Sequence, residues 1–198
     1  SEGEGCPPFY FGGLSPAAQE CAARAADVFL LWPDVTDRVV AVREEMDDRA
    51  AMFGRVLHYG WRSHVIVRET EDEARSAARR LVSKLDDATG DAIRGRSLDS
   101  ASAGVARQAE LRETADDEGY VSRHLWTGIG RARSGAGAAI VGDPDQVRDH
   151  IRELAAAGMS AFILSGYPHR AECDLFARYV LPELDHAPLE VDPLPVAL

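Results

Sequence analysis

Apolar residues along this chain fall into two patterns: short continuous runs, and longer stretches where they recur every three or four positions. Continuous runs bounded by glycine or proline predict strands at about 9–11, 27–32, 57–67 and 161–164. Stretches with helical spacing follow each run, at about 15–24, 34–52, 71–85 and 170–179. Because strands and amphipathic helices alternate, we expect parallel β/α units that make up half of an eight-stranded barrel.

Local signals mark the start of two helices and leave one long polar segment between them. Ser15 and Pro16 place a hydroxyl at an N-cap and proline at the first helical position. Asp143 and Pro144 repeat this signal and predict a further helix that ends at Gly158. Residues 86–134 are polar, with one helix expected near 101–112. An insertion of this length is typical of a lid or binding loop, and a surface excursion is the alternative.

Length and composition limit the classes to which the chain can belong. With 198 residues, 45% of them hydrophobic, it can bury one sizeable core, whereas a complete (β/α)8 barrel needs about 250 residues. A net charge of −11 disfavours nucleic-acid and anionic-membrane binders but allows a local basic pocket for a small anion. We expect no membrane span and no signal peptide. Three cysteines without metal-ligand spacing favour reduced thiols in the cytoplasm.

The carboxyl ends of the strands are the places where a parallel barrel keeps its reactive groups. This rule selects residues 12–15, Trp32, part of the third strand and residues 165–169. Residues 12–15, Gly-Gly-Leu-Ser, join a strand to a helix whose N-terminus is unobstructed. Free backbone N–H groups and the helix dipole would bind a phosphate there; an ordinary glycine turn with a helix cap is the alternative.

Arg62 and His64 stand two positions apart, so on a strand both side chains face the same side. Two cationic or potentially cationic groups on one barrel wall would be costly in a dry core, and an anionic ligand would explain them. The alternative for His64 is a core histidine with satisfied hydrogen bonds. For Tyr167, which follows the last strand, the alternative is a phenol that anchors the strand end.

Three segments carry a resemblance to a known family: GWRSHVIVRET at 60–70, GAGAAIVGDP at 135–144 and FILSGYPH at 162–169. In this order they closely resemble the flavin-dependent alkanesulfonate monooxygenases of the bacterial-luciferase-like group. Members of that group are (β/α)8 barrels, and the resemblance covers the second half of one, strands five to eight with a long lid insertion. The expected organisation is a C-terminal half-barrel at 1–184, its lid at 86–134, and an extended tail at 185–198.

The resemblance also implies roles for individual residues. Gly12, Gly13, Leu14 and Ser15 match a Gly-Gly-Ser-Ser pattern that binds the flavin phosphate, with Leu14 in place of one serine. The implied catalytic residues are Arg62, His64, Arg133 and Tyr167. The implied substrate contacts are Trp32, Arg62, Arg133, Tyr167 and His169. The Trp-Gly-Glu of the family has become Trp32-Pro33-Asp34 in this chain.

Of the implied catalytic residues, three would form the substrate pocket and one would close over it from the lid. Arg62 and His64 would help form the sulfonate and flavin-oxygen pocket. Arg133 would fold over the substrate from the lid, and Arg131 is the neighbouring alternative for this match. The Tyr167 hydroxyl would lie in the substrate pocket, where it could bind an oxyanion or donate a proton.

The activity implied by the resemblance is a flavin-dependent monooxygenation. Reduced FMN (FMNH2), supplied by a separate flavin reductase, and O2 would cleave the carbon–sulfur bond of an alkanesulfonate to give an aldehyde and sulfite. Expected partners are an anionic small-molecule substrate, the reductase, and an N-terminal half-barrel chain or a second copy of this chain, in an oligomer. The alternative is a non-catalytic half-barrel module that self-associates or pairs with an N-terminal partner.

Overall fold

A six-stranded, mostly parallel sheet forms the centre of the computed structural model, which describes residues 7–95, 102–132 and 135–191. Four strands are those expected from the apolar runs: β1 (Tyr10–Gly12), β2 (Val28–Leu31), β3 (His58–Val67) and β6 (Ala161–Ser165). Each of these strands runs parallel to the one it pairs with. The arrangement confirms the prediction of half of a β/α barrel.

β3 is the longest strand and pairs with three others. β2 pairs with residues 58–61 of β3, β6 pairs with residues 60–64, and β5 (Ala139–Gly142) pairs with residues 64–67. The residues paired with β6 overlap those paired with β2 and those paired with β5. β6 must therefore lie on the opposite edge of β3 from both of them.

Five helices lie where the sequence predicted them: α1 (Pro16–Ala25), α2 (Thr36–Ala51), α3 (Glu71–Val82), α6 (Pro144–Ala156) and α7 (His169–Tyr179). Ser15 caps α1 as expected, because its Oγ accepts a hydrogen bond from the Ala18 amide at 3.3 Å. Asp143 and Gln146 form a reciprocal capping box at the start of α6. Among the described residues, no helix has the length and apolar character needed to cross a bilayer.

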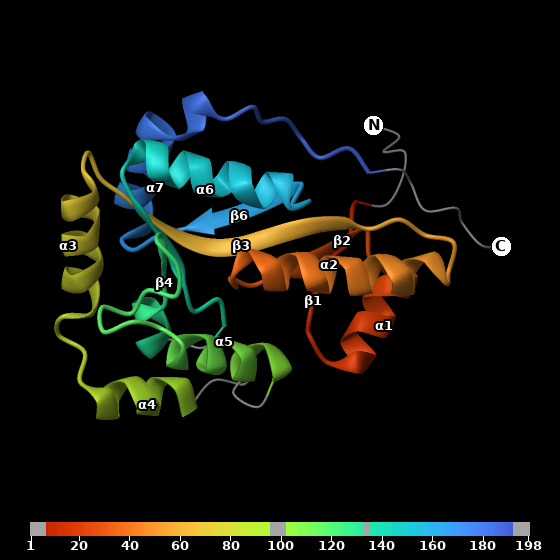
Figure 1. Ribbon diagram of the computed structural model, residues 1–198, viewed down its shortest axis with the longest axis horizontal. Helices are drawn as coiled ribbons and strands as arrows, with labels where there is room; N and C mark the ends of the chain where they lie inside the picture. The colour runs from red at the N-terminus through yellow and green to blue at the C-terminus, as the bar shows by residue number, and fades with distance from the viewer. Residues whose placement is uncertain (1–6, 96–101, 133–134, 192–198) are drawn as a thin grey trace.

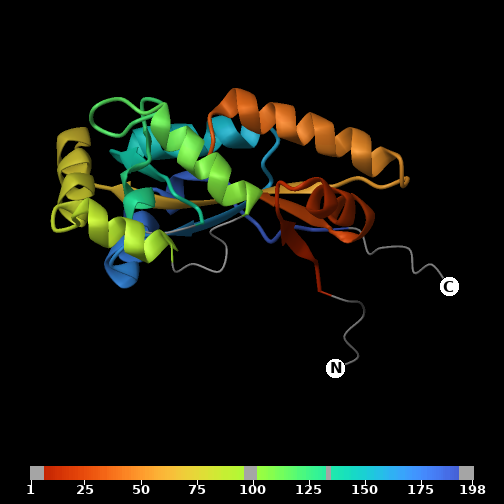
Figure 2. The same cartoon turned by 90° about the horizontal axis from the view of Figure 1, so that it is seen from below.

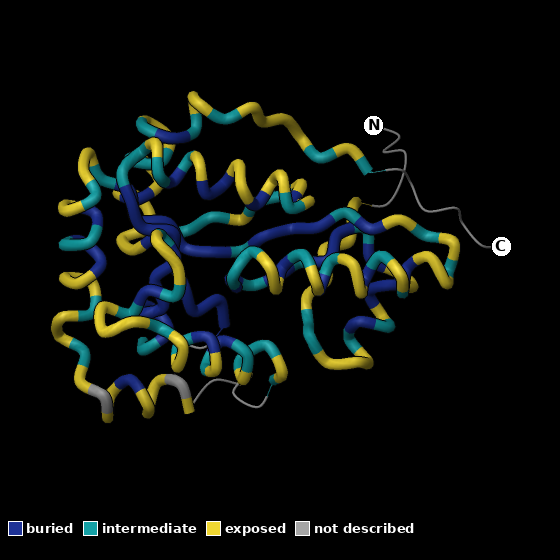
Figure 3. The backbone as a smooth tube through the Cα atoms, in the orientation of Figure 1, coloured by how far each residue is buried: buried dark blue, intermediate teal, exposed yellow. Residues whose placement is uncertain are grey.

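Side chains of β3 alternate between two faces of the sheet. Tyr59, Trp61 and Val65 pack in hydrophobic clusters with α1, α2, α6 and α7. Arg62 and His64 point to the other face, by the two-residue period of a strand. We call this the interior face, because it corresponds to the inside of a closed barrel. β3 is buried along almost its whole length (Figure 3).

The chain between α3 and α6, which includes the predicted insertion at 86–134, contains more regular structure than the sequence indicated. It comprises α4 (Asp87–Gly95), α5 (Ala103–Glu113), β4 (Leu125–Trp126), a 3-10 helix (Gly128–Arg131) and β5. Only α5 was expected, so α4, β4 and β5 are corrections to the predicted element order. β4 runs antiparallel to β5. Figure 1 shows α3 at the end of the molecule where β3 ends, α4 below it, and α5 running from there back below the sheet.

β1 and β6 are the outer strands of the half-barrel. Within the described ranges, β1 pairs with β2 alone and β6 pairs with β3 alone. Large apolar side chains are exposed on or next to these two strands: Phe9 (52%), Tyr10 (44%), Phe11 (36%) and Ile163 (41%). Exposed strand edges and apolar residues of this kind are typical surfaces for pairing with further structure.

Candidate functional site

The strand register brings the candidate residues to one level of the sheet. Leu31, the last residue of β2, pairs with Trp61, and Ser165, the last residue of β6, pairs with His64. Arg62 and His64 therefore stand level with the carboxyl ends of the neighbouring strands, although they lie within the longer β3. This is the end of a parallel barrel that carries its reactive groups.

Three rings gather next to the end of β6. The ring centroids of His64 and Tyr167 are 5.3 Å apart, and those of Tyr167 and His169 are 4.7 Å apart. His64 is only 1% exposed, whereas Tyr167 remains 37% exposed. The structure therefore brings three of the predicted site residues together, and it adds Ser165, whose Oγ lies 2.9 Å from His64 Nδ1. We call these four residues the ring cluster.

Arg62 lies half-buried on the interior face of β3. It lies two positions before His64 on β3, so both side chains leave the strand on the same side. Within the described part of the chain, its guanidinium has no hydrogen bond or ion pair. A half-buried guanidinium without a protein carboxylate suits a bound anion, because its planar donors match sets of anionic oxygens.

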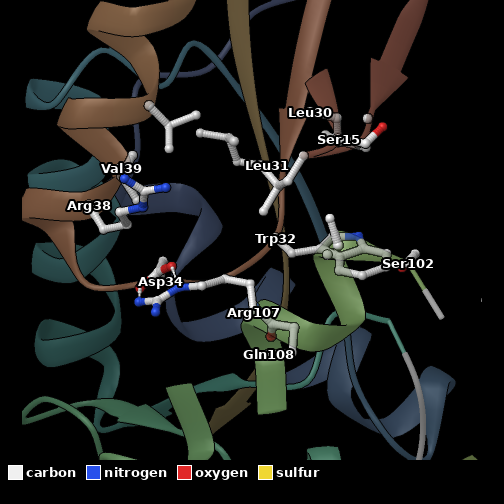
Figure 4. Close-up of a pocket in the computed structure, with 16 residues that line it drawn as sticks. Ser15, Leu30, Leu31, Trp32, Asp34, Arg38, Val39, Ser102, Arg107 and Gln108 are labelled. Atoms are coloured by element: carbon white, nitrogen blue, oxygen red, sulfur yellow. Dashed lines mark hydrogen bonds and ion pairs between the residues drawn. The ribbon is translucent and has the colours of Figure 1, made fainter. Parts of the chain in front are cut away.

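A cavity of about 470 Å³ lies beside the carboxyl ends of β1 and β2. Its walls include Gly12, Gly13, Leu14, Ser15 and Trp32, which are the predicted phosphate site and one predicted substrate contact. Residues of α2 and α5 complete the lining (Figure 4). The structure therefore gathers these five predicted residues around one space, while the ring cluster and Arg62 lie outside its walls.

The glycine turn of this cavity fits the close approach of a ligand. Gly13 has a φ of 152°, and a Cβ at this position would lie 2.7 Å from the Ala18 Cβ. Only glycine therefore leaves the backbone N–H groups in front of α1 accessible without a clash. Leu14 instead packs against the hydrophobic core cluster of α1 and α2, so it contributes no polar group.

Helix α5 covers the cavity and is tied to the end of β2. Arg107 donates hydrogen bonds of 2.6 and 2.8 Å to the Asp34 carboxylate, and these bonds raise the pKa of the Arg107 guanidinium. Gln108 Nε2 donates to the Pro33 carbonyl at 2.7 Å, and its Oε1 accepts from the Gly137 amide at 2.9 Å. Side chains of α5 thus fix this helix over the cavity (Figure 4). Figure 2 shows the backbone of α5 in green, between α3 at one end of the molecule and α1 at the other.

Sequence reasoning missed Asp34, Arg107 and Gln108 as parts of the site, and it selected Ser165 only as part of the strand-end segment 165–169, without its contact with His64. The acid at Asp34 was visible in the Trp-Gly-Glu match, but its partner was not. Arg107 and Gln108 fall on an expected helix of a polar segment, where such residues are ordinarily solvated. Their role depends on contacts between residues far apart in the chain.

One predicted catalytic residue, Arg133, lies outside the described residues. Its neighbour Arg131 is described and ends the 3-10 helix of the insertion, where it is half-buried. Arg131 is therefore the described one of the two arginines that the resemblance offers for this position.

Comparison with known proteins adds a family and several relatives. The model of the family described as luciferase-like monooxygenase matches residues 1–161. A sulfoquinovose monooxygenase from Novosphingobium aromaticivorans is 61% identical over 186 residues, which are 94% of this chain and 51% of that protein. A sulfoquinovose monooxygenase from Agrobacterium fabrum is 52% identical over 180 residues, which are 91% and 47% of the two chains. The chain thus spans about half the length of the curated relatives it matches.

Solved structures share the fold of this chain. DmoA from Hyphomicrobium sulfonivorans superposes with a TM-score of 0.67 at 17% identity, over 90% of this chain and 41% of that one. The long-chain alkane monooxygenase LadA gives a TM-score of 0.65 at 21% identity, again over 90% and 41%. At such identities the likeness concerns the fold alone, and it covers less than half of each solved chain.

Proposed function

Because this chain belongs to the luciferase-like monooxygenase family, we propose that it supplies the C-terminal half of the barrel of a flavin-dependent monooxygenase acting on a sulfonated small molecule. One observation carries the proposal. Arg62 and His64 share the interior face at the level where the neighbouring strands end, and Tyr167 lies against His64. A cation, an imidazole and a phenol at this end of the barrel are suited to an anionic guest.

The substrate that we propose is a sulfonated sugar. Both curated relatives are named for sulfoquinovose, and their identities of 61% and 52% favour this substrate over a simple alkanesulfonate. Arg62 would bind the sulfonate oxygens, because a guanidinium presents several N–H donors in a fixed plane. The arginine of the lid, Arg133, would close over the same guest, and Trp32 and His169 would contact it.

The cofactor that we propose is reduced FMN. Gly12, Gly13 and Ser15 would hold its phosphate at the N-terminus of α1, since the turn leaves no room for a Cβ at Gly13. Because Leu14 supplies no polar side-chain group, backbone N–H groups and the Ser15 hydroxyl remain as donors. When bound, the flavin would supply the oxygen chemistry with O2.

Side chains of this chain would bind and orient the substrate and would protect the site from water. Arg62 would fix the anionic end of the substrate on the interior face. Tyr167 and His64 would present hydrogen-bond donors to developing negative charge, and the phenol could also donate a proton. Helix α5, tied to Asp34 through Arg107, would keep water out of the neighbouring cavity. Sulfite and an oxidised sugar are the products expected from carbon–sulfur cleavage.

The proposed assembly needs further β/α units and a reductase. β1 and β6 offer unpaired edges among the described residues, and Phe9, Tyr10, Phe11 and Ile163 expose apolar surface there. A complementary N-terminal half-barrel would pair with both edges and cover this surface. A second copy of this chain is the other way to cover it. A separate flavin reductase would deliver the reduced FMN.

A reconstitution experiment tests the proposal. The chain is co-expressed with the N-terminal half of the relative from Novosphingobium aromaticivorans, and sulfite release from sulfoquinovose is measured with a flavin reductase. We expect sulfite release that requires both halves. We also expect Tyr167→Phe to lower kcat/KM by about tenfold, as for the loss of one acid/base or hydrogen-bonding group.

The matched control is Tyr179→Phe, because the Tyr179 hydroxyl donates to Glu69 on the exposed surface. This variant should stay within about twofold of the parent. A stable assembled barrel that releases no sulfite would contradict the proposed monooxygenase function. A self-associated chain that binds no flavin would instead favour a non-catalytic half-barrel module.

A further inference from the structure

Ser165 is paired with His64 both in the sheet and through its side chain. The two residues are opposite one another in the parallel ladder between β6 and β3, so their side chains leave the sheet on the same face. Ser165 Oγ lies 2.9 Å from His64 Nδ1, and the imidazole is 1% exposed. A buried imidazole therefore has a serine hydroxyl as a fixed neighbour at one ring nitrogen.

The Ser165 hydroxyl indicates which nitrogen of the His64 imidazole carries the proton. Among the described residues, His64 Nδ1 is the only hydrogen-bond partner of Ser165 Oγ. If Nδ1 carried the proton, the hydroxyl would accept it, and its own O–H would have no acceptor in the described protein. When the O–H donates to Nδ1 instead, both groups are satisfied and the neutral imidazole carries its proton on Nε2.

The surroundings hold this pair in place. The Ser63 Oγ lies 3.1 and 3.2 Å from the His64 and Ala138 carbonyl oxygens, which share its one proton, and this contact fixes the backbone under the imidazole. Tyr167 lies over the imidazole from the loop that follows Ser165. A ring held on two sides loses little further freedom when it binds a ligand.

The helix after this loop is anchored to the same strand. Arg68, just beyond β3, donates to both carboxylate oxygens of Glu172 in α7, at 3.0 and 2.6 Å. Glu172 is 5% exposed, so this two-point pair is largely shielded from water. The loop that follows Ser165 and carries Tyr167 is thereby held at one end by β6 and at the other by α7.

We infer that Ser165 is a positioning residue, which fixes the tautomer of His64 so that Nε2–H serves as a hydrogen-bond donor on the interior face. Nε2 is farther from the backbone than Nδ1, so the donor extends away from β3. The inference rests on the proposed function for its purpose, an anionic guest at this face. The tautomer itself is a property of the chain alone.

Nitrogen NMR of the histidine side chains tests the inference without any activity. The chain is labelled with 15N-histidine, and His64→Gln identifies the His64 signals among the six histidines. We expect a protonated, pyrrole-type shift at Nε2 and an unprotonated, pyridine-type shift at Nδ1. In Ser165→Ala, we expect both nitrogens to move toward intermediate shifts as the two tautomers exchange. The reversed pattern in the parent, or unchanged shifts in Ser165→Ala, would overturn the inference.

Two matched variants separate positioning from folding. Ser165→Thr keeps the hydroxyl on a residue suited to a strand and should restore the parent shifts. Ser63→Ala removes a serine at the neighbouring position whose hydroxyl bonds only to backbone carbonyls, so the tautomer of His64 should not change. If Ser63→Ala shifts the His64 nitrogens as much as Ser165→Ala does, the effect is a general loosening and the inference is wrong.

Kinetics of the assembled barrel distinguish this inference from the proposed function. If the barrel releases sulfite, Ser165→Ala should lower kcat by about fivefold with little change in KM, and Ser165→Thr should restore it. If the parent barrel releases no sulfite but the shifts behave as expected, the proposed function fails and the tautomer assignment stands. Parent-like turnover in Ser165→Ala would overturn the positioning role.

Discussion

Arg107 and Asp34 form a two-point ion pair that ties the insertion to the end of β2. Nε and Nη2 of Arg107 lie 2.6 and 2.8 Å from the two carboxylate oxygens of Asp34, whose side chain is 10% exposed. Because Asp34 follows Trp32 by two residues, the pair fixes where α5 lies over the cavity of the glycine turn. The insertion is therefore held by a specific contact as well as by apolar packing.

Removing this contact should loosen α5 before the rest of the molecule. In Arg107→Ala, the largely buried Asp34 carboxylate loses its charged partner and keeps only the Val35 amide as a donor, so the local opening free energy should fall by about 1–3 kcal/mol. Amide hydrogen exchange of residues 103–113 measures this opening. The control is Arg148→Ala, whose partners Asp145 and Asp149 are exposed, so about 0–1 kcal/mol is expected. Equal exchange of α5 in both variants would contradict the role of the pair.

The pair between Arg68 and Glu172 should stabilise the whole chain. Glu172→Gln keeps the shape of the side chain but removes the charge that faces a two-point guanidinium, so the free energy of unfolding should fall by about 1–3 kcal/mol. Urea denaturation measures this loss. Glu69→Gln is the matched control, because Glu69 is exposed and accepts from the Tyr179 hydroxyl. If both variants lose the same stability, burial of the pair has no special effect.

Gly13 and Gly54 both have positive φ, but a side chain would meet a neighbour only at Gly13. An added Cβ would lie 2.7 Å from the Ala18 Cβ at Gly13, whereas nothing lies within 4 Å at Gly54. Gly54→Ala should lower the free energy of unfolding by about 1–2 kcal/mol, because its backbone conformation is unfavourable for a residue with a side chain. Gly13→Ala should cost more and should weaken FMN binding to the assembled barrel at least about tenfold, measured by titration. FMN affinity that survives Gly13→Ala would place the phosphate elsewhere.

His150 should make the chain less stable as the pH falls. Burial lowers its pKa, His124 lowers it further and Glu153 raises it, so the net shift is downward. The unfolded chain therefore binds more protons than the folded chain once the pH drops below about 6.5, and folding stability is lost. The carboxyls of Glu71 and Asp86, whose pKa values are lowered, lose their contribution only at more acidic pH.

Urea denaturation at pH 7.5 and pH 5.5 tests this dependence. The parent should lose up to about 1.4 kcal/mol per pH unit for each histidine that must stay neutral. His150→Gln should show a smaller difference between the two pH values. A variant whose stability depends on pH as steeply as the parent would assign the effect to His124 or to other groups.

Several local features of this fold were predicted correctly from the sequence. The helix start at Ser15 and the capping box of Asp143 and Gln146 use side chains within three residues of the groups they satisfy. The four barrel strands coincide with apolar runs, because each buries side chains against helices. The ring cluster was predicted in part, since His64 and Tyr167 lie in segments that match the family.

Other features depend on contacts that no local pattern reveals. β5 follows a run of glycine and alanine with no alternation, and it is a strand because it pairs with residues 64–67 of β3 and is buried on both faces. The pairs Arg107 with Asp34 and Arg68 with Glu172 join residues 73 and 104 positions apart. The hydroxyl of Ser165 looked like part of a strand end, and its contact with His64 follows only from the register of β6 on β3.

Arg62 offers the most direct test of the central claim, that the interior face of this half-barrel binds an anionic substrate. The measurement is the KM for sulfoquinovose in the sulfite-release assay of the assembled barrel, with Arg62→Gln compared against Arg80→Gln. Arg80 is an exposed arginine of α3 and serves as the control. Loss of charge-assisted hydrogen bonds worth about 1.5–3 kcal/mol should raise KM about 10- to 150-fold in Arg62→Gln alone. A KM unchanged in Arg62→Gln, or raised equally in both variants, would contradict the claim.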